Sequence, residues 1–210
     1  SGTASGAIAA DFNNDTWFDL YIPVFGEENK LFLNDGAGHF VDGTTREIAD
    51  IGTSSIPALG DFDNDGHLDI FQPSLGLGDD LPFRAFMLLA LGNATFLDVT
   101  EGIGLGPLTR SSIFLSRLAD MDNDGDLDLM THEGASYFVN NGDGSFTDQT
   151  FRSGYNGTFA MGDFDGNGAL DIWSDNTLYS IAEPVAHSLR IRLEGTQSNR
   201  SGIGARLVAT

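Results

Sequence analysis

The chain has 210 residues and no cysteine, and its 31 Asp and Glu residues against 10 Lys and Arg give a formal net charge of -21 at pH 7. Its apolar content of 40%, with 27 glycines and 6 prolines, is typical of a globular, turn-rich protein. The acidity argues against nucleic acid and anionic membranes as partners, the lack of cysteine excludes disulfides and thiol catalysis, and no apolar run approaches the ~20 residues of a membrane span.

One acidic pattern of nine residues, D-x-[DN]-x-[DN]-x-x-x-D, recurs along the chain, starting at Asp11, Asp61, Asp120 and Asp163. Calcium takes about six to eight oxygen ligands, and side chains at alternate positions of a tight turn converge on one point. The pattern therefore predicts up to four calcium ions, one in each loop. The expected side-chain ligands are Asp11, Asn13, Asp15 and Asp19; Asp61, Asp63, Asp65 and Asp69; Asp120, Asp122, Asp124 and Asp128; and Asp163, Asp165, Asn167 and Asp171. The residue at position seven is expected to bind through its backbone carbonyl; these residues are Trp17, His67, Asp126 and Ala169.

The same oxygens begin an EF-hand, but an EF-hand loop closes with a bidentate Glu at position twelve. Here that position holds Ile22, Gln72, Thr131 or Ser174, so the EF-hand interpretation fails. Short apolar segments precede each loop, and strand-like alternation follows it. Each loop is therefore expected at the tip of a β-hairpin.

The first loop departs from the others at its sixth position. That position usually needs a positive φ, and it is Gly66, Gly125 or Gly168 in the other three loops but Thr16 here. A β-branched residue adopts positive φ unfavourably. We expect this site to be the weakest or empty.

A second hairpin signal lies between the acidic loops, in segments that begin at Lys30, Met87 and Tyr137 and contain Asn, Asp and Gly turns. One repeat is then strand, acidic loop, strand, linker, strand, turn, strand, which makes a four-stranded antiparallel blade. The predicted fold class is all-β, a β-propeller-like array of about four blades. The predicted units lie near 1–52, 53–106, 107–155 and 156–182.

The loops with their flanking strands resemble the FG-GAP or VCBS repeats of integrin-type β-propellers and of many secreted bacterial proteins. The segment from Leu189 to Thr210, with its run SNRSGIGAR, resembles the start of an ASPIC/UnbV domain, so 183–210 is expected to be a truncated segment of that kind. The first resemblance implies calcium holding each blade's first hairpin, a secreted or cell-surface location, and roles in adhesion, matrix contact or carbohydrate binding. Because no apolar run approaches the length of a membrane span, no membrane insertion is expected.

Both ends of the chain look cut in mid-repeat, and three explanations stay open: a fragment, a small four-bladed ring, or an open array completed by neighbouring copies. An open row of blades predicts a homo-polymer through unsatisfied edge strands, and a head-to-tail contact that does not close gives a filament. The alternatives are a lectin-like or protein-ligand-binding propeller, or an accessory domain of a larger secreted enzyme. No G-x-S-x-G, P-loop or H-E-x-x-H motif is present, so catalytic activity is not expected. Sequons for glycosylation begin at Asn14, Asn93, Asn156 and Asn199.

Overall fold

The structure is a computed structural model of residues 1–210. It describes residues 3–4, 6–49, 51–53, 55–73, 85–105, 116–131, 136–149, 159–174 and 176–180. The predicted ASPIC/UnbV-like segment 183–210 and the sequons at Asn156 and Asn199 lie outside these residues. None of the described residues forms a helix with the length and hydropathy that a membrane crossing requires.

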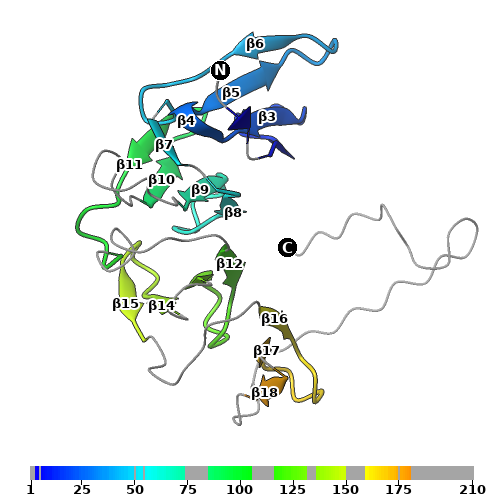
Figure 1. The fold of residues 1–210 in the computed structure, drawn as a ribbon, viewed down its shortest axis with the longest axis vertical. Helices are drawn as coiled ribbons and strands as arrows, with labels where there is room; N and C mark the ends of the chain where they lie inside the picture. Colours follow the sequence, from blue (N-terminus) through cyan, green and yellow to red (C-terminus); the bar gives the residue numbers. More distant parts are fainter. Residues whose placement is uncertain are drawn as a thin grey trace, which may run out of the picture.

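Four antiparallel sheets follow one another in chain order along the long axis of the molecule (Figure 1). We number them sheets 1 to 4. Sheet 1 comprises β2 (Ile8–Ala10), β3 (Asp19–Ile22), β5 (Lys30–Asn34) and β6 (Phe40–Asp42). Sheet 2 comprises β8 (Ala58–Gly60), β9 (Asp69–Gln72), β10 (Phe86–Ala90) and β11 (Phe96–Asp98). Sheet 3 comprises β12 (Ser116–Ala119), β13 (Asp128–Thr131), β14 (Tyr137–Asn140) and β15 (Phe146–Asp148). Sheet 4 comprises β16 (Phe159–Gly162), β17 (Asp171–Ser174) and β18 (Thr177–Tyr179).

Within each sheet the strands pair in sequence order, and the acidic loop joins the first two. The ninth-position Asp pairs with the last residue of the first strand in all four sheets, as in Ala10↔Asp19 and Gly60↔Asp69. This constant register holds the loops in equivalent places at one end of their sheets. The prediction of acidic loops at hairpin tips is confirmed, as is the strand order of the repeat in sheets 1 to 3.

A fifth, three-stranded sheet was not predicted. It pairs β4 (Val24–Glu28) with β1 (Thr3–Ala4) on one side and β7 (Ile51–Thr53) on the other, with a register irregularity between Phe25 and Glu28. The chain thus leaves sheet 1 after β3. The next strand, β4, pairs with one strand that precedes β2 in the sequence and with one that follows β6.

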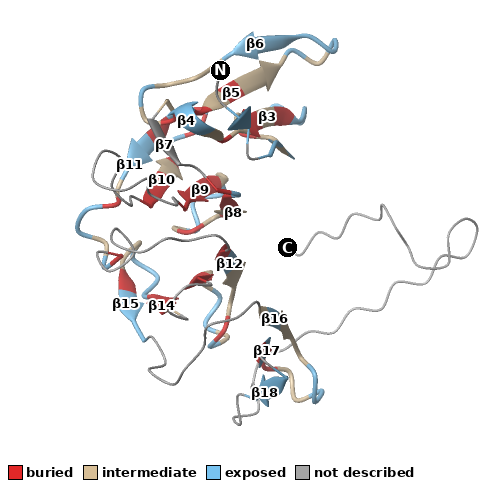
Figure 2. Cartoon of the chain, viewed as in Figure 1, coloured by how far each residue is buried: buried red, intermediate tan, exposed pale blue. Residues whose placement is uncertain are grey.

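The hydrophobic core lies between consecutive sheets, in three clusters. Alternate residues of the central strands belong to different clusters, because neighbouring side chains of a strand point to opposite faces. In β9, Ile70 belongs to the cluster shared with sheet 1 and Phe71 to the cluster shared with sheet 3, and both are fully buried. Figure 2 shows buried residues in the central strands and exposed residues in the outer strands β6 and β18.

The prediction of an all-β fold with four-stranded antiparallel sheets is confirmed for the described residues, and a propeller-like arrangement is compatible with it. The limits of the individual repeat units remain predictions.

Candidate metal-binding loops

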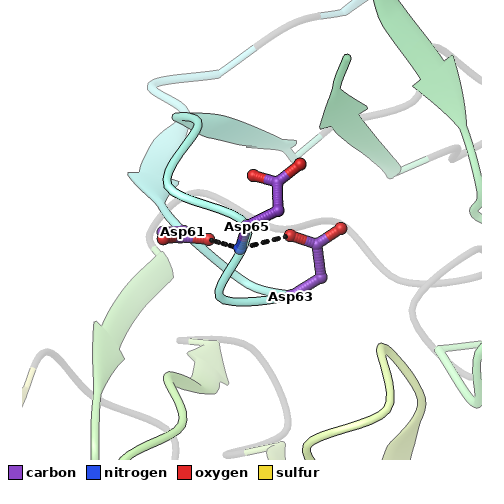
Figure 3. A group of neighbouring side chains, drawn as sticks. All are labelled: Asp61, Asp63 and Asp65. Atoms are coloured by element: carbon purple, nitrogen blue, oxygen red, sulfur yellow. Dashed lines mark hydrogen bonds between the residues drawn. The ribbon is translucent and has the colours of Figure 1, made fainter. Parts of the chain in front are cut away.

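The second loop brings three carboxyl groups together at the tip of the β8–β9 hairpin (Figure 3). One carboxyl oxygen of each of Asp61, Asp63 and Asp65 lies within 4.8 Å of the others. Backbone N–H groups bond to all three carboxyls: the Asp65 N–H donates to Asp61 Oδ1 at 3.1 Å and to Asp63 Oδ1 at 3.2 Å, and the His67 N–H donates to Asp65 Oδ1 at 2.8 Å. The Gly66 N–H donates to Asp61 Oδ2 at 3.0 Å.

The third and first loops repeat this arrangement. The Asp124 N–H donates to Asp120 Oδ1 at 3.1 Å, and the Asp15 N–H donates to Asp11 Oδ1 at 3.1 Å. Carboxyl oxygens of Asp120, Asp122 and Asp124 again lie within 4.8 Å of one another. In the first loop Asn13 replaces one carboxylate, and its Oδ1 accepts the Asp15 N–H at 3.0 Å. The chain path through the three loops is the same.

The fourth loop gathers a different trio. Carboxyl oxygens of Asp163, Asp165 and Asp171 lie within 4.8 Å of one another. The N–H bonded to Asp163 Oδ1 belongs here to Gly166, at 2.7 Å, one residue earlier than in the other loops. Asn167 turns toward Asp165, and its Nδ2 donates to Asp165 Oδ2 at 3.2 Å.

Two positions in every loop have left-handed backbone, which explains the residue types found there. Position four has φ between 59° and 61° at Asn14, Asn64 and Asn123, and Asn is one of the few non-glycine residues that adopts this region readily. Position six has a positive φ in all four loops, including 77° at Thr16. The sequence prediction that Thr16 occupies a glycine conformation is therefore confirmed.

The ninth-position aspartates are buried and serve the fold directly. Asp19, Asp69 and Asp128 are at most 1% exposed. Asp69 Oδ2 accepts the Phe62 N–H at 2.7 Å, and its Oδ1 accepts the Ala90 N–H at 2.7 Å. The equivalent donors to Asp19 belong to Phe12 and Asn34, and those to Asp128 belong to Met121 and Asn140. One carboxylate thus joins the acidic loop to the third strand of its own sheet.

Burial and crowding disfavour the charged form of several loop carboxylates. Burial raises the pKa of Asp69 and that of Asp128 to about 6, with further raising by neighbouring carboxylates. Desolvation also raises the pKa of Asp63 and of Asp122, each with two carboxylates beside it. A cation in the loop would relieve this repulsion, because it favours the ionised form of each group around it.

The residues present fit a calcium ion. Ca²⁺–oxygen distances of about 2.3–2.6 Å place two ligands of one ion up to about 5 Å apart, and the carboxyl oxygens of each trio fall within that span. The expected ligand atoms are all oxygens, which suits a hard cation better than zinc or copper.

Side chains at positions four and seven connect consecutive loops, which sequence analysis missed. The Asn14 side-chain amide donates to His67 Nδ1 at 2.6 Å, and Asn64 Nδ2 donates to Asp126 Oδ1. His67 and Asp126 were assigned only a backbone role. The recurrence of Asn at position four was a usable signal, but its partner depends on how neighbouring sheets are placed. The fourth loop has Ala169 at position seven, whose side chain cannot accept such a bond.

No curated protein matches the sequence significantly. Among solved structures, the chain resembles a lectin of Agrocybe aegerita, described for specific recognition of non-reducing terminal N-acetylglucosamine, with 19% identity and a TM-score of 0.48 over 81% of this chain and 48% of the lectin. It also resembles the Photorhabdus luminescens Tc holotoxin pore, with 19% identity and a TM-score of 0.44 over 79% of this chain and 8% of that one. The chain therefore spans less than half the length of either protein.

The model of the FG-GAP-like repeat family matches residues 11–71 and 120–174, more than half of the chain. Each matched region begins at one acidic loop and ends in the strand that follows the next one, so it contains two acidic loops. The ASPIC/UnbV resemblance has no counterpart among these matches. The chain belongs to the FG-GAP-like repeat family.

Proposed function

We propose that the protein is a calcium-ordered binding and structural module that acts outside the cell, without catalytic activity of its own. The observation that carries the proposal is the convergence of carboxyl oxygens in successive loops at equivalent hairpin tips. Membership of a repeat family whose members often bind Ca²⁺ supports it, as does the net charge of -21, which bound cations would offset.

In this proposal calcium acts mechanically. Each loop holds carboxylates that repel one another, and the same loop is hydrogen-bonded through its ninth-position Asp to the adjoining strand. An ion removes the repulsion and holds the loop in the shape that this Asp requires. The sheets are then presented as a rigid surface on which other molecules can bind.

Calorimetric titration with calcium tests the proposal, with magnesium as the competing ion. We expect calcium to bind with weak, millimolar-range affinity typical of extracellular modules, on the order of 10⁻⁴–10⁻³ M, and magnesium to bind less well. Asp63→Ala should remove one site, whereas Asp143→Ala, an exposed turn carboxylate bonded to Ser145, should leave calcium binding unchanged. Equal binding by the two variants, or no binding by the parent chain, contradicts the proposal.

Ligand binding through exposed aromatic residues is the second candidate. Trp17 is 50% exposed on the first loop, and its indole lies against the turn at Gly36. An exposed indole is a stacking surface for a sugar ring. Screening against a glycan panel tests this function, and Trp17→Ala should abolish any binding found.

A further inference from the structure

The contacts between sheets follow one rule. We count positions from the first Asp of each acidic loop and continue the count into the strand that follows it. The side chains at positions two and eleven project from one sheet onto the next. Phe12 meets Phe96 edge-to-face with ring centroids 6.3 Å apart, and Phe62 meets Phe146 in the same way at 6.0 Å. The residues at the two projecting positions of loops one to three are at most 3% exposed; they are Phe12 and Tyr21, Phe62 and Phe71, and Met121 and Met130. We call this the projecting face of a sheet.

The opposite side of each sheet is a receiving face, formed by position eight of the loop and the first aromatic of the outer strand. Phe96 and Phe146, in this place on sheets 2 and 3, are each 5% exposed. Leu68 and Leu170, at position eight of their loops, pack against the clusters shared with the preceding sheet. Consecutive sheets thus join through one projecting and one receiving face.

Sheet 4 carries a projecting face that no described residue covers. Phe164 at position two is 53% exposed, and Trp173 at position eleven is 45% exposed. Leu178, which pairs with Trp173 across β17 and β18, is 38% exposed on the same face. These three exposed apolar side chains occupy the positions at which the preceding sheets bury theirs.

Sheet 1 carries the complementary receiving face, also uncovered by described residues. Phe18 at position eight is 67% exposed, and Phe40, the equivalent of Phe96 and Phe146, is 45% exposed. Phe40 pairs with Asn34 in the register that Phe146 has with Asn140, so its ring stands on the corresponding side of the sheet.

We propose that sheet 4 of one copy packs on sheet 1 of a second copy, with Phe164 and Trp173 against Phe18 and Phe40. The contact continues an interface that the chain already makes three times, and the two uncovered faces are the two halves of it. It is heterologous, so repetition gives a closed ring or an open filament. This inference rests on the structural role in the proposed function and on the homo-polymer that the sequence predicts, but it does not require calcium to be the cation in the loops.

The contact differs from the predicted pairing of edge strands, because it uses sheet faces and side chains. It also lacks the side-chain amide bond between consecutive loops, because position four of the fourth loop is Gly166 and position seven of the first is Trp17. Copies with a net charge of -21 repel one another, and association is therefore expected to strengthen with ionic strength.

Sedimentation velocity of the 210-residue chain over a concentration series tests the proposal, in millimolar calcium at moderate and at high salt. We expect species larger than the monomer that grow with concentration. In a Trp17→Phe background, Trp173 is the remaining tryptophan, and its emission should shift to the blue as the oligomers form.

Paired variants identify the faces. Trp173→Glu and Phe40→Glu should each weaken self-association at least about tenfold, because a buried aromatic anchor typically contributes that much or more. An equimolar mixture of the two should form a heterodimer through the remaining intact pair of faces and nothing larger. Val41→Glu is the matched control: Val41 is 62% exposed on β6 beside Phe40, pairs with Leu33, and should leave association unchanged. Circular dichroism checks that each variant is folded.

Three results overturn the inference. The chain could stay monomeric at every concentration and salt. It could assemble while both glutamate variants assemble equally, which points to strand edges instead. The mixture of variants could fail to form a heterodimer although each is folded. Calorimetric calcium binding is measured on the same samples, so a failure of the metal proposal is seen separately from a failure of this contact.

Discussion

Replacement of Asp69 by alanine separates the structural role of a loop carboxylate from metal binding. Asp69 is fully buried and accepts two backbone N–H groups, from Phe62 and Ala90, each at 2.7 Å. In Asp69→Ala both donors lose their partner, and each buried donor left unsatisfied costs about 1–3 kcal/mol. Relief from burying a charge offsets part of this loss. We expect the free energy of unfolding to fall by about 3 kcal/mol.

The matched variant is Asp65→Ala. Asp65 lies on the exposed side of the same loop and accepts one N–H, from His67 at 2.8 Å. In the absence of calcium this variant should lose little stability, because water replaces an exposed hydrogen bond at low cost. In saturating calcium it should lose the stabilisation that the ion provides.

Urea unfolding followed by circular dichroism, at a series of calcium concentrations extrapolated to zero, measures both variants. Asp69→Ala should be destabilised at every calcium concentration, and Asp65→Ala only where calcium stabilises the parent. A loss of less than about 1 kcal/mol for Asp69→Ala at zero calcium would refute the reasoning, because Asp69 would then act only through a bound ion.

Three further predictions concern backbone conformation and pH. Thr16→Gly should raise the free energy of unfolding by about 1 kcal/mol, since a non-glycine residue at φ 77° costs about 1–2 kcal/mol and glycine returns part of this as unfolded-state entropy; thermal unfolding measures it. Gly104→Ala should cost several kcal/mol more than Gly102→Ala in the same assay: both glycines have a positive φ, but a Cβ on Gly104 would overlap the Phe146 carbonyl and one on Gly102 meets nothing within 4 Å. In chelator, the melting temperature should rise as pH falls from 7 to 5. The pKa values of Asp69 and Asp128 are raised to about 6 from an ordinary 3.8, so the folded state binds more protons than the unfolded state in that pH range.

Each of these has a contrary outcome. A Thr16→Gly chain no more stable than the parent means that position six is not left-handed. Equal losses of stability for Gly102→Ala and Gly104→Ala mean that the backbone at Gly104 does not approach β15. A melting temperature that falls with pH in chelator means that the buried carboxyls are already stabilised as anions; in calcium such a fall is expected, because protons compete with the ion.

The hairpins were predictable because their determinants are local. The nine-residue spacing, the glycines and the alternating apolar residues all act within about twenty residues, and the pairing Gly60↔Asp69 follows from them. The sheet of β1, β4 and β7 was not predictable in this way. Its central strand, Val24–Glu28, is mostly exposed and lacks an apolar alternation, and both of its partners come from other parts of the chain.

The ninth-position aspartates show why the sequence predicted the loop carboxylates but not all of their roles. Ligation of a cation and acceptance of backbone N–H groups need the same carboxylate at the same place, so spacing alone does not separate them. The donor from the third strand, such as the Ala90 N–H, lies 21 residues away from its acceptor. The bond from Asn14 to His67 is beyond prediction from one repeat, because it depends on the placement of two sheets.

Because the sheets bury their faces only against immediate neighbours, the molecule is a stack of similar, exchangeable units. A whole repeat could be gained or lost by duplication or deletion, and the new neighbours would meet through the same positions as the old. Point insertions have no such freedom, since one extra residue in a strand moves every later side chain to the wrong face. Length variation among natural versions of this chain should therefore come in steps of one repeat, or fall in the linkers between the hairpins.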